Sequence, residues 1–248
     1  MTERLYGSLS GFAALLDGLS YAGGRNAKLK LMADWLRETP DPDRGWGLAA
    51  LTGGLDLPSV KPALIRALIE ERVDPLLFRL SYDYVGDLAE TVSLLWPGDG
   101  GDAPGLAEVV EQLRTLSRSE APAVLAALLD LLDASGRFAL LKLATGNLRV
   151  GAGARLARVA FGQAFGIAAD DVEELWHGVA PPYAELFAWG EGRAEKPDLS
   201  LRPLFRPFML AHPLEAPEDL ETSAYAAEWK WDGIRAMLVR VHGETRLF

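Results

Sequence analysis

The sequence predicts a mainly α-helical protein in which a helical body is followed by the first strands of a β-rich region. Apolar residues recur at helical spacing near the start, as in Leu9, Phe12, Leu16 and Leu19. Alternation of apolar and polar residues begins only at Ala224. A polar stretch rich in glycine and proline separates the two parts. We therefore expect a helical domain over 1–190, a linker over 191–202 and the start of a second domain over 203–248.

The helical part contains roughly a dozen expected helices and no internal repeat. Leu29, Met32 and Leu36 continue the helical spacing, and Asp41-Pro42 and Asp74-Pro75 each predict an N-cap followed by proline at the first helical position. Further amphipathic segments are Pro62–Glu71, Val85–Leu95, Leu106–Leu116 and Pro122–Leu132.

Strands are expected from Ala224 to the last residue. Tyr225–Trp231 predicts a first strand, Asp232-Gly233 a hairpin turn and Ile234–Val241 a second strand. His242-Gly243-Glu244 predicts another turn, and Arg246-Leu247-Phe248 begins a third strand. A sheet that stops within a strand leaves backbone groups unpaired, so we expect the chain to be a fragment of a longer protein.

The composition excludes several classes of function. The chain has no cysteine and only three dispersed histidines, so neither a disulfide framework nor a cysteine or histidine metal site is expected. No signal peptide or membrane segment is evident, which predicts a soluble, cytoplasmic protein. The net charge of −10 argues against a nucleic-acid partner unless positive charge is concentrated locally.

Positive charge is concentrated between Ala134 and Ala169. This stretch has no acidic residue and a local charge of +5, which predicts a basic face on an acidic body. Its basic residues are Arg137, Lys142, Arg149, Arg155 and Arg158.

The centre of this stretch is rich in glycine. Gly146, Gly151 and Gly153 allow close approach of a ligand, and a helix beginning near Ala152 would direct free N–H groups at a phosphate. Arg155 would lie on that helix. The alternative is a tight connection between helices with solvated arginines.

A second site is indicated by the pattern K-x-D-G-x-R, formed by Lys230, Asp232, Gly233 and Arg235. Strand periodicity places Glu228 and Lys230 on one face. A lysine amine becomes nucleophilic when its pKa is lowered by burial or by cationic neighbours. The alternative is an exposed lysine on an edge strand before a turn.

The lysine pattern resembles the signature of the covalent nucleotidyltransferases, which comprise DNA ligases, RNA ligases and capping enzymes. The resemblance implies that Lys230 is catalytic and attacks the α-phosphate of ATP, forming a lysyl-AMP intermediate. It also implies that Glu228 lies beside the adenine and that Arg235 contacts the nucleotide.

The helical part resembles the DNA-binding domain of ATP-dependent DNA ligases. Gly146-Asn-Leu-Arg-Val-Gly151 is similar to a G-x-L-R-x-G loop that grips the minor-groove side of a nick. Val85–Val92 and Arg206–Ala211 resemble other segments of the family, in the family's order. The combination is most similar to bacterial ligases with an N-terminal helical domain.

This resemblance implies a DNA ligase that seals nicks in double-stranded DNA during repair, replication and recombination, and acts as a monomer. Its DNA-binding residues would be Gly146, Asn147, Arg149, Gly151 and Arg155. The family's later serine–arginine motif, acidic Mg²⁺ ligands, triphosphate-binding lysines and OB-fold domain do not occur in the sequence. We therefore expect this fragment to bind nicked DNA but to adenylate itself slowly or not at all.

Three alternatives stay open. The chain could be a non-catalytic DNA-binding module. An RNA ligase or capping enzyme would share the lysine pattern but would not explain the helical part. An all-α scaffold would require two coincidental motifs. Two interpretations stay open for Arg25 and Lys28, at the start of a predicted helix: contact with DNA, or simple solvation, which is more common for basic residues at a helix start.

Overall fold

The computed structural model describes residues 7–100, 103–146, 148, 150–205, 218, 220–226, 228–229 and 233–248. In these residues twelve α-helices and one antiparallel pair of strands are present, which confirms the mainly helical fold class. The first six helices are α2 (Leu9–Tyr21), α3 (Arg25–Glu38), α4 (Asp43–Thr52), α5 (Pro62–Glu70), α6 (Pro75–Val85) and α7 (Leu88–Leu95). The next six are α8 (Leu106–Thr115), α9 (Ala121–Leu131), α10 (Ala134–Thr145), α11 (Ala154–Phe165), α12 (Ala169–Trp176) and α13 (Ala184–Gly190).

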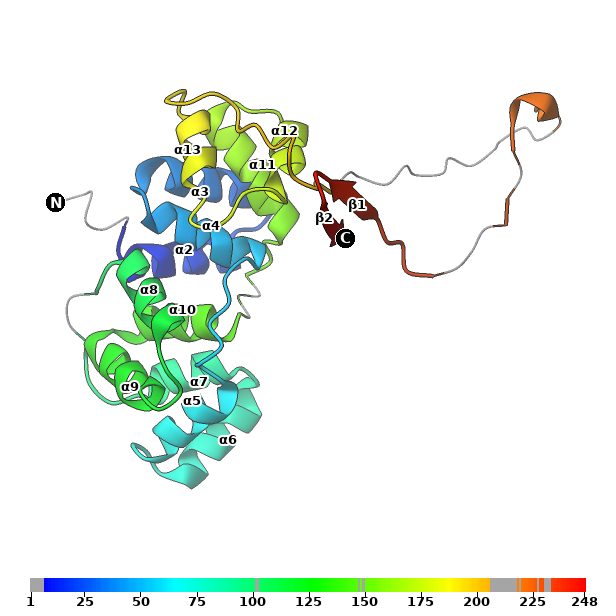
Figure 1. The fold of residues 1–248 in the computed structure, drawn as a ribbon. Coiled ribbons are helices and arrows are strands. Elements are labelled where there is room, and N and C mark those ends of the chain that lie inside the picture. The colour runs from blue at the N-terminus through cyan, green and yellow to red at the C-terminus, as the bar shows by residue number, and fades with distance from the viewer. Residues whose placement is uncertain are drawn as a thin grey trace.

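Helix α10 connects two groups of helices. In the view of Figure 1, α2, α3, α4, α11, α12 and α13 form the upper group, and α5, α6, α7 and α9 form the lower group. Helix α10 packs against α2 of the upper group and α7 of the lower one, and α11 packs along α3. One continuous apolar core runs through both groups.

The apolar faces predicted for the first helices are buried in this core. Phe12, Leu16 and Leu19 on α2 are fully buried, as are Met32 and Leu36 on α3. Their spacing of three and four residues places them on the side of each helix that meets its neighbours. Helical periodicity therefore identified the core-facing side of both helices.

One of the two predicted Asp-Pro caps is confirmed, and the other is wrong. Asp74 caps α6 because its carboxylate accepts from the N–H groups of Leu76 and Leu77, both at 2.9 Å. Asp41 caps no helix, since its carboxylate accepts two hydrogen bonds of 2.7 Å from the guanidinium of Arg44. A two-point ion pair is stronger than a cap bond and claims the same oxygens.

Residues 191–205 follow α13 and pack against the helical body. Glu191 pairs at 2.6 Å with Arg44, a buried side chain on α4. Lys196 pairs with Asp171 of α12 at 2.7 Å. The segment that the sequence predicts as a linker is thus attached to the helices by ion pairs at its start and middle.

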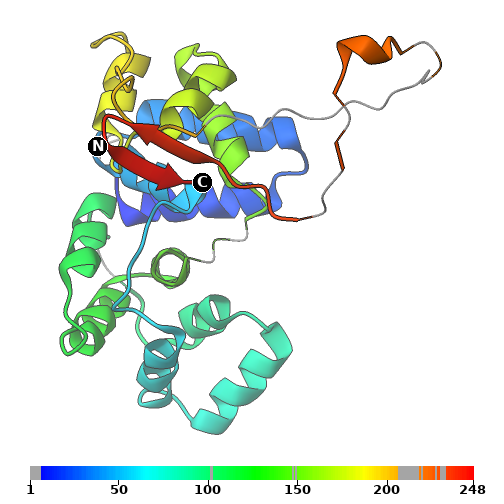
Figure 2. The same ribbon diagram turned by 45° about the vertical axis from the view of Figure 1, so that its right-hand side comes forward.

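The only strands in the described part of the chain are β1 (Leu238–Val241) and β2 (Glu244–Leu247). They form a hairpin whose turn residues, His242 and Gly243, both have positive φ angles of 46° and 87°. This turn confirms the one predicted there, because two-residue hairpin turns require such backbone angles. Figure 2 shows the hairpin in front of the upper helices. The ring of Phe248 lies 5.8 Å from that of His177.

The strands predicted ahead of this hairpin do not form as expected. Residues 225–226 and 228–229 are in no strand, and the strand predicted over Ile234–Val241 begins only at Leu238. Trp229 is 82% exposed and Ile234 is 100% exposed. A strand needs a paired neighbour, and no other described segment pairs with these residues.

Arg137 provides a test of the helical body. Its guanidinium is buried and donates to the carbonyls of Leu129, Trp96 and Gly98 at 2.8–2.9 Å. Arg137→Met removes these bonds and leaves buried acceptors unsatisfied, so we expect a loss of roughly 2–4 kcal/mol in the free energy of unfolding. Urea denaturation measures this. The exposed Arg155→Met is the control and should change stability by less than about 0.5 kcal/mol; equal stability of both variants would contradict the assignment.

Candidate nucleic-acid interface

Helices α3 and α11 lie side by side and run in the same direction. Near the start of α3, the Nζ of Lys28 donates to the carbonyls of Val150 and Gly151, at 3.0 and 3.2 Å, just ahead of α11. Near the end of α3, the Nε of Arg37 donates to the carbonyl of Ala164 at 3.0 Å, near the end of α11. The N-termini of the two helices therefore lie at the same end of the pair.

Both N-termini expose unpaired backbone groups. Gly24 caps α3 and Gly153 caps α11, and neither offers a side-chain cap bond. No acidic residue occupies the first turn of either helix. Arg25 and Arg155 are exposed there, and within the described residues neither has an ion-pair partner. Two helix dipoles, free N–H groups and two guanidinium groups suit this end to phosphate oxygens.

The two glycines at the ends of the predicted loop have a backbone role. Gly146 ends α10 with φ of 67°, and Gly151 has φ of 65°. Both angles lie in the left-handed region, which side chains with a Cβ rarely adopt. Between them, the side chain of Val150 is 3% exposed and belongs to the apolar core. Gly153 differs, because its φ of −92° is open to any residue.

The basic stretch does not form one basic face. Arg137 is buried, and the side chain of Lys142 is 5% exposed and pairs with Asp87. Arg158 donates to a carboxylate of α12 at 2.9 Å. Among the described basic residues of this stretch, only Arg155 is an exposed cation without a carboxylate partner. Three of the five charges thus stabilise the helical body.

Asp87 connects the Val85–Val92 segment to the helix that precedes the loop. Its carboxylate accepts from the backbone N–H of Glu90 at 3.0 Å, capping α7, and from the Nζ of Lys142 on α10. Burial raises the pKa of Asp87, but the hydrogen bonds from Lys142 and Glu90 outweigh it and lower that pKa overall. The ion pair fixes α10 four residues ahead of Gly146.

Of the predicted nucleotide site, Lys230 and Asp232 lie outside the described residues. Glu228 and Arg235 are described and exposed, without a hydrogen bond to one another. Nowhere in the described ranges do three potential metal-ligating side chains gather. Asn147 and Arg149, predicted to bind DNA, also lie outside the described residues.

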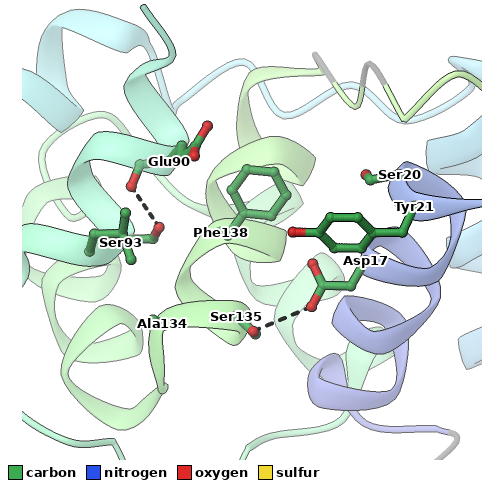
Figure 3. Close-up of a pocket in the computed structure, with 9 residues that line it drawn as sticks. Asp17, Ser20, Tyr21, Glu90, Ser93, Ala134, Ser135 and Phe138 are labelled. Atoms are coloured by element: carbon green, nitrogen blue, oxygen red, sulfur yellow. Dashed lines mark hydrogen bonds between the residues drawn. The ribbon is translucent and has the colours of Figure 1, made fainter. Parts of the chain in front are cut away.

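A cavity of about 310 Å³ lies between α2, α7 and α10 (Figure 3). Tyr21 and Phe138 line it together with the carboxylates of Asp17 and Glu90. The hydroxyl of Ser135 donates to Asp17 at 3.4 Å. Two carboxylates disfavour a phosphate, so this cavity is not a candidate for the nucleic-acid interface.

Sequence reasoning missed the role of Lys28. The sequence leaves Lys28 either solvated or in contact with DNA, but its ammonium donates to two carbonyls of the loop before α11. The contact joins residues 122 positions apart. No local pattern indicates such a partner, because it exists only when α3 and α11 are packed together.

The N-terminal ends of α3 and α11 have the chemical character of a phosphate-binding surface. No protein-family model matches the chain. The chain is 27% identical to a DNA ligase of Methanothrix thermoacetophila over 96% of its own length and 47% of that protein. It is 30% identical to a protein named "Probable DNA ligase" of Anaeromyxobacter sp. over 94% of its length and 43% of that protein.

The similarity to these two proteins extends over nearly the whole chain, and the chain spans less than half of the length of either one. Among the described helices, none combines the length and apolar character that a membrane span requires.

Substitution of the loop glycines tests the geometry of the interface. Gly151→Ala should destabilise the protein by about 1–2 kcal/mol, because alanine at positive φ is strained and its Cβ would lie 2.3 Å from the Nζ of Lys28. Gly153→Ala is the matched control, since no atom lies within 4 Å of the added Cβ. Urea unfolding of both variants checks this; a larger loss for Gly153→Ala would contradict the loop geometry.

Proposed function

We propose that the chain is the DNA-binding and nucleotide-accepting part of an ATP-dependent DNA ligase that seals nicks in duplex DNA. The observation that carries the DNA-binding half is the pair of parallel helix N-termini with exposed Arg25 and Arg155. The similarity to two proteins named as DNA ligases supports the assignment of the duplex as partner.

Charge distribution favours one orientation on the duplex. The chain carries a net charge of −10, so most of its surface repels the phosphate backbone. The shared end of α3 and α11 has no acidic residue in either first turn. DNA would therefore approach at that end, where Arg25, Arg155 and, from the family resemblance, Arg149 contact phosphates and Gly146–Gly151 approaches the groove.

The nucleotide half of the proposal depends on the sequence pattern around Lys230. With ATP as substrate, the lysine amine attacks the α-phosphorus, the N–P bond forms and pyrophosphate leaves. AMP then passes to the 5′-phosphate of the nick, and attack by the 3′-hydroxyl releases it. Glu228 and Arg235 would hold the nucleotide, within a second domain that begins at 203.

A non-catalytic DNA-binding module is the second candidate. The observation that favours it is that the side chains of Glu228 and Arg235 are both exposed. The two candidates differ in one outcome, because only the ligase transfers AMP to protein. Both would act on DNA in the cytoplasm, and we propose that the chain does so as a monomer.

The salt dependence of DNA binding tests the proposed phosphate contacts at the shared end of α3 and α11. We expect the chain to bind a labelled nicked duplex more tightly than an intact one, with affinity falling as salt rises. Arg155→Met and Arg149→Ala should each reduce the slope of log K against log salt by about 1, since each removes one phosphate contact.

Arg118→Met is the control for these variants. Arg118 is exposed between α8 and α9, and its removal should leave both affinity and slope unchanged. If Arg155→Met and Arg149→Ala also match the parent at every salt concentration, the shared helix end does not bind DNA.

Covalent labelling tests Lys230. Incubation with α-labelled ATP and Mg²⁺ should give little protein–AMP, because the family's acidic Mg²⁺ ligands and triphosphate-binding lysines do not occur in the sequence. Whatever label forms should disappear in Lys230→Ala and in Lys230→Arg, which keeps the charge but has no nucleophilic amine. DNA binding should be unchanged in both variants. Label that survives either substitution would refute the assignment of Lys230.

A further inference from the structure

Two of the three N–H donors of the Lys28 ammonium are engaged by the loop ahead of α11. The ammonium donates to two consecutive carbonyls, those of Val150 and Gly151, at 3.0 and 3.2 Å. The side chain is half-buried, and no described carboxylate pairs with it. An ammonium has three donors, so two of them are already used in charge-assisted bonds.

The backbone at Gly151 leaves room for the Lys28 ammonium because the residue has no Cβ. Gly151 adopts φ of 65°, and a Cβ at this position would lie 2.3 Å from the Nζ of Lys28. The preceding residue, Val150, has its side chain in the apolar core. The peptide that joins Val150 to Gly151 is therefore held by apolar packing of the Val150 side chain and by the ammonium of Lys28.

The other end of the loop is anchored by a second lysine. Lys142 on α10 pairs with Asp87, the cap of α7, and lies four residues before Gly146. Lys28 binds the chain three residues before α11 begins. The two lysines thus fix the points at which the chain leaves α10 and enters α11.

We infer that Lys28 is a positioning residue, which acts on DNA by fixing the loop ahead of α11 and not by contacting a phosphate. This inference rests on the proposed DNA-binding function. Two of the three N–H donors of Lys28 hold the carbonyls of Val150 and Gly151, so most of its hydrogen-bonding capacity is used on the loop. Its effect on DNA is therefore the placement of Gly151 and of the free N–H groups that open α11.

The salt dependence of binding separates the two roles. Lys28→Met should weaken binding to a nicked duplex roughly three- to tenfold, as expected for losing about one net hydrogen bond. The loss should be similar at every salt concentration, with the slope of log K against log salt unchanged. A direct phosphate contact would instead lower the slope by about 1.

Arg37→Met is the matched control. It also removes a cation of α3 that donates to a carbonyl at α11, but at the opposite end of the helix pair. It should bind nicked DNA as the parent does. Amide hydrogen exchange should rise around 150–154 in Lys28→Met and stay at parental rates there in Arg37→Met.

A lower slope with unchanged exchange would overturn the inference and make Lys28 a phosphate ligand. Unchanged affinity in Lys28→Met would overturn it as well. If the parent itself shows no salt-sensitive DNA binding, the proposed function fails. Exchange in the free protein then still reports whether Lys28 holds the loop, so the two failures are distinguishable.

Discussion

Helices α3 and α11 pack side by side in the same direction, and the position of each described candidate DNA-binding group follows from that packing. Lys28 and Arg37 bridge the pair near its two ends. The arrangement brings together two N-termini from parts of the chain more than a hundred residues apart. Helix dipoles act only over the first turn, so two of them reinforce each other only when their ends coincide. Parallel packing meets that condition.

The basic residues show that the fold, and not their clustering in the sequence, decides which of them are exposed. A buried cation is tolerated only when hydrogen bonds or an opposite charge replace its water. Arg137 meets this requirement with three backbone carbonyls, and Lys142 with Asp87. Charges used in this way hold helices together and contribute little to an external field. Clustering of basic residues in sequence therefore overestimated the basic surface.

The β region shows a different limit of sequence reasoning. The turn at His242 and Gly243 was predictable because two-residue hairpins depend on neighbouring residues alone. The strand predicted ahead of it was not obtained, because a strand depends on a partner that can be distant in sequence. Exposed Trp229 and Ile234 show that the alternating pattern has no packing surface within the described residues.

The sequence by itself determined the helical class, the buried faces of α2 and α3, the cap at Asp74 and the final hairpin. It also carried the lysine pattern and the glycine loop that led to the proposed function. All of these depend on residues a few positions apart, where periodicity and turn chemistry act. Only the tertiary structure decided that Asp41 pairs with Arg44, that Arg137 and Lys142 are internal, and that Lys28 holds the loop. Lys142 and Lys28 find their partners in distant segments, as Arg137 does at Trp96 and Gly98. For Asp41, two possible bonds compete for one carboxylate, and packing decides between them.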